Sequence, residues 1–125
     1  MNWGITGAIL MALAVAFGAF GAHGLRNRLD AYSMSVYEKA VFYHFVHALG
    51  ILLIYLLART TAISAAGQAR SGWLLFIGII LFSGSLYALA ISGIRTLGAI
   101  TPIGGVAFIA GWIVLAYELA AARRA

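Results

Sequence analysis

Four long apolar stretches, separated by short polar connections, fill almost all of this 125-residue chain. They predict helices at about residues 3–25, 36–59, 71–93 and 102–121. Each stretch approaches or exceeds the about 20 residues that a helix needs to cross about 30 Å of hydrocarbon. The stretches lack the alternation of a barrel strand, so each must satisfy its own backbone as a helix. We therefore expect an all-α polytopic membrane protein: one domain, residues 1–125, folded as a compact antiparallel bundle of four transmembrane helices.

Polar residues interrupt the pattern at residues 27–35, 60–71 and 93–101, and the connections are expected there. The fourth helix has a start signal, because Thr101 can act as N-cap and Pro102 suits the first helical position. No Lys or Arg precedes the first apolar run. This argues against a cleaved secretory signal peptide and predicts that the first helix is retained.

Composition sets the solvent and removes several chemistries. Hydrophobic residues make up 64% of the chain and charged residues 9%, and the mean hydropathy is +1.02. The absence of cysteine excludes disulfides and thiolate metal sites within the chain. A net charge of +5 could suit nucleic acid, but the Lys and Arg residues fall at helix ends, where they meet lipid headgroups. We expect membrane lipids, not nucleic acid, as the surroundings of these charges.

Four crossings place both termini on one side of the membrane. That side also receives four arginines: Arg59, Arg70, Arg123 and Arg124. The other side receives four basic residues: Arg26, Arg28, Lys39 and Arg95. The N-terminal amine and the position of Lys39 inside the second helix break this tie, and they favour cytoplasmic termini.

Small residues at four-residue spacing predict where helices touch, because lipid gives helices no hydrophobic reason to associate. They lie in the first helix at Ala14, Gly18 and Ala22, in the third at Gly84, Ala88 and Ser92, and in the fourth at Ala107 and Gly111. Gly18 and Gly84 are therefore expected to face neighbouring helices. Gly104 and Gly105 are interpreted as close packing at the start of the fourth helix.

Two histidines in the second helix are the leading candidate for a functional site. His44 and His47 share a helical face and lie about 13 and 18 Å below the membrane surface, counted from Ser35. Counted from the same side, Ser85 and Ser83 of the third helix lie at about 12 and 15 Å. Polar groups at this depth are costly unless paired. The candidate polar site comprises His23, Tyr43, His44, His47, Ser83, Ser85, Tyr87 and Thr101.

Three interpretations of the histidine pair compete. Imidazole ligates haem iron, zinc and copper, but two histidines on one turn cannot sandwich an iron, and His23 is the only other histidine. A neutral pair could relay protons or hold a quinone carbonyl or a lipid headgroup. The interpretation we favour is that both histidines point into the bundle and lock helices together through hydrogen bonds. The expected partners are polar groups of the third helix, chiefly Ser83, Ser85 or Tyr87, with a backbone carbonyl or His23 as further options. No metal, bound cofactor or catalytic residue is expected, with haem and quinone as the open alternatives.

The remaining charges suggest no catalytic centre. Glu118 lies near the end of the fourth helix on the side of Arg59 and Arg70, so an ion pair at the membrane interface is expected. Small proton-coupled multidrug exporters share this outline of four helices, but they depend on a carboxylate in the first helix. The first helix here has none, which counts against an exporter.

Several segments resemble a known family, in order and with similar spacing over nearly the whole chain. They are residues 18–25 (GAFGAHGL), 43–47 (YHFVH), 82–87 (FSGSLY), 101–105 (TPIGG) and 111–112 (GW). The family is catalogued as domain of unknown function 423 and has a mitochondrial relative called transmembrane protein 256. The resemblance implies a small, four-helix protein of the bacterial inner membrane. It implies no established activity, substrate or catalytic residue.

The sequence thus favours a non-enzymatic component that binds a lipid, a quinone or a partner protein. A chain with so little outside the bilayer contacts partners mainly through its helices, so an accessory subunit of a larger membrane complex is expected. The alternative is a redox or proton-relay protein that uses His44 and His47. A small transporter is the weaker alternative.

Overall fold

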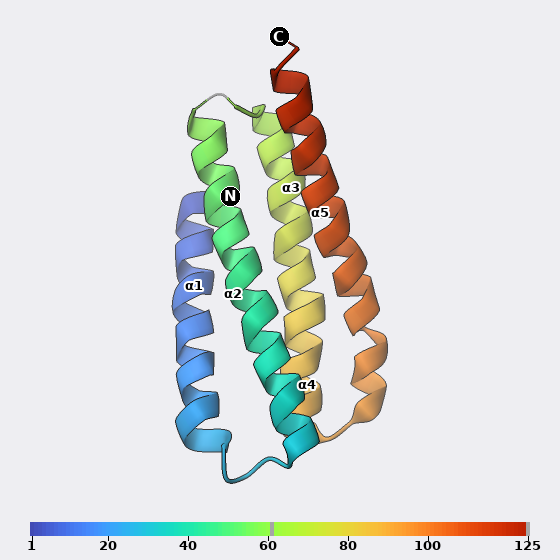
Figure 1. Ribbon diagram of the computed structural model, residues 1–125. Helices are drawn as coiled ribbons and strands as arrows, with labels where there is room; N and C mark the ends of the chain where they lie inside the picture. Colours follow the sequence, from blue (N-terminus) through green and yellow to red (C-terminus); the bar gives the residue numbers. More distant parts are fainter. Residues whose placement is uncertain (61, 125) are drawn as a thin grey trace.

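The computed structural model describes residues 1–60 and 62–124, which form helices joined by short connections (Figure 1). The first rod is α1, Trp3–Phe20, continued by the π-helical turn η1, Gly21–Leu25. The second is α2, Ala31–Arg59. The third joins α3, Ala65–Gly78, the π-helical turn η2, Ile79–Ser83, and α4, Gly84–Ser92. The fourth joins the 3₁₀ turn η3, Arg95–Ala99, to α5, Thr101–Ala122.

All four rods of the described chain are long and apolar enough to cross a membrane, with mean hydropathies of 2.0 to 2.4 over their most apolar parts. Neighbouring rods run in opposite directions, and both chain ends lie at the same end of the bundle (Figure 1). The predicted all-α bundle of four membrane helices is confirmed.

Two helices begin earlier than the polarity of the sequence predicts. Asp30 caps α2 by accepting a 2.7 Å hydrogen bond from the amide of Ser33, and the helix starts five residues before the expected position. Ser64 caps α3 by accepting from the amide of Gly67 at 2.9 Å, six residues early. In both cases the polar residues form the first helical turns and not a loop, because polarity marks contact with water and leaves backbone conformation open.

The start of α5 also differs from the prediction. Thr101 is its first helical residue and not its N-cap. The amides of Ile103 and Gly104 already bond to the carbonyl of Ile100, at 3.1 and 3.4 Å, because η3 runs directly into α5. The hydroxyl of Thr101 is therefore available to another helix. Pro102 occupies the first turn, as expected.

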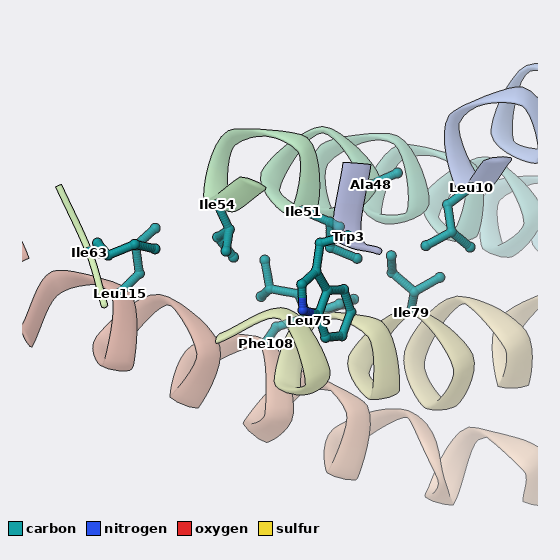
Figure 2. Packing of buried hydrophobic residues seen from close by; sticks show 10 residues of the cluster. All are labelled: Trp3, Leu10, Ala48, Ile51, Ile54, Ile63, Leu75, Ile79, Phe108 and Leu115. Atoms are coloured by element: carbon teal, nitrogen blue, oxygen red, sulfur yellow. The ribbon is translucent and has the colours of Figure 1, made fainter. Parts of the chain in front are cut away.

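The core runs along the length of the bundle, among all four rods. The second and third rods form an inner pair, and the first and fourth rods lie outside them. α1 packs mainly on α2 and α5 mainly on α3, while α2 also contacts α3 and α4. Buried residues make up 39% and 44% of the central spans of the inner rods, but 22% in each outer rod. The main cluster draws on all four rods (Figure 2): Trp3, Leu10, Ala48, Ile51, Ile54, Leu75, Ile79, Phe108 and Leu115, with Ile63 from the connection before α3.

Only part of the predicted small-residue packing occurs. Gly18 faces α2, where an added methyl would touch Val41 at 3.4 Å. The expectation for Gly84 is wrong, since a methyl there would meet nothing, and Ala88 and Ser92 are exposed. The π-helical turn η2 holds more residues per turn than an α-helix and so rotates α4 relative to α3.

The close approaches occur elsewhere. A methyl on Gly104 would overlap the backbone of Phe82, and one on Gly78 would overlap the Phe108 ring. Gly111 is similarly pressed against Leu75. The third and fourth rods therefore pack through these glycines.

Candidate functional site

His44 links three helices near the middle of the bundle. Its Nδ1 lies 2.9 Å from the hydroxyl of Tyr87 on α4, and its side chain is only 3% exposed. Its Nε2 is buried without a hydrogen-bond partner in the described structure, and its ring lies 6.1 Å from the Phe17 ring on α1. The predicted contact between His44 and Tyr87 is present.

Tyr37 extends this contact toward α1. Its hydroxyl donates a hydrogen bond to the carbonyl of Phe17, and its ring lies 5.3 Å from that of Tyr87. The Phe17 ring is 5.0 Å from the Tyr87 ring, edge on. Polar and aromatic groups of α1, α2 and α4 thus interlock around His44.

His47 points to a different neighbour. Its Nδ1 donates to the carbonyl of Tyr43, one turn earlier on α2, at 2.7 Å. Its ring stacks on Phe108 of α5, with centroids 3.4 Å apart and planes 11° apart. The expectation that His47 meets a polar group of the third rod is wrong. His47 follows His44 by three residues, so its side chain points about 60° away from that of His44 around the axis of α2.

The two candidate serines bond to other partners. Ser83 donates to the carbonyl of Ala40 on α2 at 2.8 Å. Ser85 lies 2.6 Å from the hydroxyl of Thr101 and also donates to the carbonyl of Phe82 at 3.0 Å. Both serines hold helices together, and neither is hydrogen-bonded to a histidine in the described chain.

His23 is exposed in η1, so the expectation that it could join the other two histidines is wrong. Tyr43 is partly buried, with its ring 4.4 Å from that of Phe82. Within residues 1–60 and 62–124, no three His, Asp or Glu side chains come close enough to share a metal ion. Six of the eight candidate residues meet as three pairs, and Ser83 and His23 stand apart, so they do not form a single site: the pairs are His44 with Tyr87, His47 with Tyr43, and Ser85 with Thr101.

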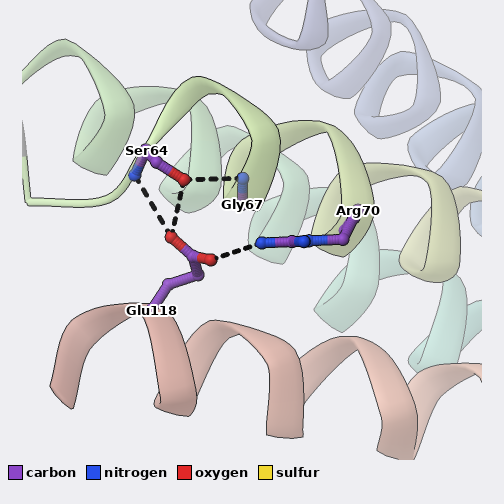
Figure 3. Close-up of polar contacts among 4 residues, drawn as sticks. All are labelled: Ser64, Gly67, Arg70 and Glu118. Atoms are coloured by element: carbon purple, nitrogen blue, oxygen red, sulfur yellow. Dashed lines mark hydrogen bonds and ion pairs between the residues drawn. The ribbon is translucent and has the colours of Figure 1, made fainter. Parts of the chain in front are cut away.

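A second polar cluster joins α3 to α5 (Figure 3), at the end of the bundle where α3 begins and α5 ends. Glu118 of α5 accepts a hydrogen bond from the Arg70 guanidinium through Oε1 at 2.7 Å. Its Oε2 accepts from the Ser64 hydroxyl at 2.8 Å and from the Ser64 amide at 3.3 Å. The predicted ion pair is confirmed with Arg70, whereas Arg59 lies over the Tyr55 ring, 6.0 Å from its centroid.

Gly67 explains how Glu118 reaches this position. A methyl group at residue 67 would overlap the Glu118 carboxyl group. The roles of Ser64 and Gly67 were missed by the sequence analysis. A usable signal was Ser64 itself, since serine before a helical stretch is a common N-cap.

Two adjoining hollows lie on the outer face of α2, along its half nearer the termini. One, of 520 Å³, lies toward α1 and is lined by Asn2, Gly4, Ile5, Ala8, Leu49, Leu52, Tyr55 and Leu56. The other, of 430 Å³, reaches α5 and is lined by Val46, Leu49, Gly50, Leu52, Leu53, Leu56 and Trp112. They share Leu49, Leu52 and Leu56, so we treat them as one apolar surface, the α2 trough. His44 and His47 are absent from both linings.

Comparison with known proteins gives a family match over most of the chain. The sequence model of a protein family, described as protein of unknown function (DUF423), matches residues 17–105, from the last turn of α1 to the first turn of α5. A UPF0382 membrane protein of Staphylococcus saprophyticus is 55% identical over 111 residues, which cover 89% of this chain and 90% of the relative. The UPF0382 membrane protein YwdK of Bacillus subtilis is 50% identical over 112 residues, 89% of each chain. No solved structure matches.

Proposed function

The chain belongs to the DUF423 family of membrane proteins, and we propose that it is a non-enzymatic accessory component that binds a transmembrane helix of a partner protein. The observation that carries this proposal is the α2 trough. Its lining includes Asn2 and the Tyr55 phenol but is otherwise apolar, and it runs beside α1, in one of the two less buried rods. A helix from another chain would find apolar contacts there without having to expose a polar group.

The α1 side of the trough favours a helix as the occupant. Gly4 and Ala8 line it, and the exposed Ala12 and Ala16 continue the same four-residue spacing along α1. Small residues let two helix backbones approach, which is the main source of attraction between helices in lipid. The leucines of α2 beside them stay outward, with Leu49 and Leu56 each 58% exposed.

The trough suits a helix better than a quinone. A quinone ring needs hydrogen-bond donors for its carbonyls, and the donors in the lining, Asn2 and Tyr55, both lie at the end of the trough near the termini. The rest of the α2 wall, from Val46 to Leu53, offers aliphatic side chains and Gly50. An apolar helix needs nothing more.

We place the protein in the bacterial cytoplasmic membrane with both termini in the cytoplasm. The relatives named as membrane proteins come from Staphylococcus and Bacillus, which supports a bacterial membrane. Four arginines lie at the end that carries the termini, and Lys39 sits about 12 Å along α2 from its start. Its charge therefore counts less toward the opposite side, as the positive-inside rule requires.

The test compares two alanines that are both exposed and lie on opposite outer rods, Ala8 of α1 and Ala116 of α5. Membranes with wild type, Ala8→Phe or Ala116→Phe are extracted gently and examined by native mass spectrometry, with a photo-crosslinker in place of Leu49. We expect a complex with a protein of defined mass in the wild type and in Ala116→Phe, and its loss in Ala8→Phe. Crosslinks to lipid alone in all three proteins would contradict the proposal.

A proton relay is the second candidate, favoured by the imidazole–phenol pair of His44 and Tyr87 between α2 and α4. The relay predicts proton flux in proteoliposomes that carry a pH-sensitive dye. Tyr87→Phe would abolish that flux, whereas Tyr117→Phe, at an exposed phenol, would not. An accessory protein gives flux no greater than empty liposomes in all three samples.

A further inference from the structure

Another hollow, separate from the α2 trough, lies between α3 and α5 near the termini. It has a volume of 380 Å³ and is lined by Arg70, Ile113, Val114 and Tyr117. We propose that it binds an anionic phospholipid, with Arg70 on the phosphate and one acyl chain along the outer face of α5. The inference goes beyond the proposed partner helix and does not depend on it.

Arg70 is held in place but remains open to a ligand. One of its terminal nitrogens bonds to Glu118 at 2.7 Å, while 59% of its side chain is exposed. Glu118 is itself fixed, because it is buried and its other oxygen is occupied by Ser64. A guanidinium carries five N–H donors in a fork that matches phosphate oxygens. The bond to Glu118 therefore orients the group and leaves donors for a second anion.

The hollow lies at the depth of lipid headgroups. The third rod has 28 residues, about 42 Å at 1.5 Å per residue. Centred on about 30 Å of hydrocarbon, it projects about 6 Å at each end. Arg70 is about 8 Å from the start of the rod, at the boundary between hydrocarbon and headgroups. Trp73 and Tyr117 are 44% and 68% exposed near this level, as in an interfacial aromatic belt.

The walls of the hollow and the local charge select the ligand. Ile113 and Val114 give it aliphatic sides that suit an acyl chain and would be useless to free phosphate. Arg59, Arg123 and Arg124 lie at the same end, where Glu118 is the one acidic side chain among the described residues. This excess of positive charge favours an anionic headgroup over a zwitterionic one.

The test measures retention of phosphatidylglycerol against phosphatidylcholine, by native mass spectrometry of purified protein titrated with each lipid. Arg70→Gln alone would leave Glu118 buried and unpaired, so the main variant is Arg70→Gln/Glu118→Gln, which removes both charges. Its melting temperature reports whether it still folds. Arg59→Gln is the matched control, since Arg59 lies at the same end but outside the hollow.

We expect wild type and Arg59→Gln to prefer phosphatidylglycerol by about tenfold in apparent affinity, and the folded double variant to lose that preference. Equal affinity for the two lipids in wild type, or equal loss in Arg59→Gln, would overturn the site. Displacement of the lipid by an equal concentration of inorganic phosphate would overturn the assignment to lipid. Ala8→Phe should keep the lipid preference, so failure of the partner-helix proposal is distinguished from failure of this one.

Discussion

The hydroxyl of Tyr87 on α4 lies 2.9 Å from Nδ1 of His44 on α2. His44 is buried near the middle of α2, and Tyr87 is partly buried five residues before the end of α4. The pair therefore ties the inner rods together, and the Phe17 ring, 6.1 Å from the His44 ring, adds α1. Its first expected consequence is for stability.

His44→Phe should destabilise the bundle, because Tyr87 would lose its hydrogen-bond partner. A double-mutant cycle with Tyr87→Phe should give a coupling energy of about 0.6 kcal/mol and at most about 1.7 kcal/mol, the range of hydrogen bonds between membrane helices. Reversible unfolding in mixed micelles measures it. Additive effects of the two substitutions would show that the hydrogen bond contributes nothing, and Tyr117→Phe serves as the control for a lost phenol.

Gly104→Ala should be far more damaging than Gly84→Ala. A methyl at residue 104 meets the backbone of Phe82, which cannot move aside as a side chain can, whereas a methyl at residue 84 meets nothing. We expect Gly104→Ala to cost about 1–3 kcal/mol through overpacking and Gly84→Ala to be neutral or slightly stabilising. Thermal unfolding in one detergent compares them, and equal melting temperatures would refute the packing of the third rod on α5.

Removing the Glu118 side chain should lower the stability of the protein more than removing the hydroxyl of its partner Ser64. Glu118→Ala removes the acceptor of the Ser64 hydroxyl and amide, and we expect a loss of about 1–3 kcal/mol for the two hydrogen bonds. Ser64→Ala removes one of these bonds and also the N-cap of α3, so we expect a loss of about 1 kcal/mol or more. Denaturant unfolding orders the two variants against Arg59→Gln, for which no loss is expected.

Asp30 should make the start of α2 sensitive to acid. Its pKa lies below the ordinary 3.8, first because the Ser33 amide donates to the carboxylate and then through the Ser33 side chain and the charge of Arg95. A lowered pKa in the folded state means that the capping contribution is present above pH 3.8 and is lost as the pH falls below it.

Hydrogen exchange of the Ser33 amide reports this loss locally. We expect protection at pH 5 to decline as the pH approaches 3, after correction for intrinsic exchange. Asp30→Asn keeps a capping oxygen without the charge, so its protection should not change with pH. A parallel decline in Asp30→Asn would assign the effect to another group.

Most of the fold could be predicted from sequence because lipid allows few alternatives. Twenty apolar residues in a row must form a helix, and four such runs must form a bundle. The starts of α2 and α3 were misplaced because the same polar residues occur in loops and in helical turns exposed to water. Asp30 and Ser64 mark the true starts, and their capping role was the better guide.

The packing of the third rod could not be predicted, because η2 changes the helical register. Spacing rules assume a uniform 3.6 residues per turn, and a π turn between Ile79 and Ser83 breaks that assumption. Gly84 consequently faces outward, while Gly78 before the turn packs on Phe108. Nothing in the sequence of residues 79–83 marks such a turn.

The candidate site was predicted at the level of depth but not of direction. Counting residues placed His44 and the third rod at matching depths, and the contact with Tyr87 agrees with this. Depth does not say toward which neighbour a side chain rotates, so His47 was assigned to the third rod while it stacks on Phe108 of α5. Whether the histidines have a function beyond packing is decided by the flux measurement.

The unequal lengths of α1 and α2 have a consequence for the bilayer itself. The first rod spans 23 residues and the second 29, about 34 and 43 Å. Trp3 packs edge on against Trp73, eight residues into the third rod, so the inner rods continue past the start of α1. The hydrophobic boundary around the protein is therefore stepped, lower at α1 than at its neighbours. Lipids beside α1 must thin or tilt to follow it, so the protein should be sensitive to bilayer thickness.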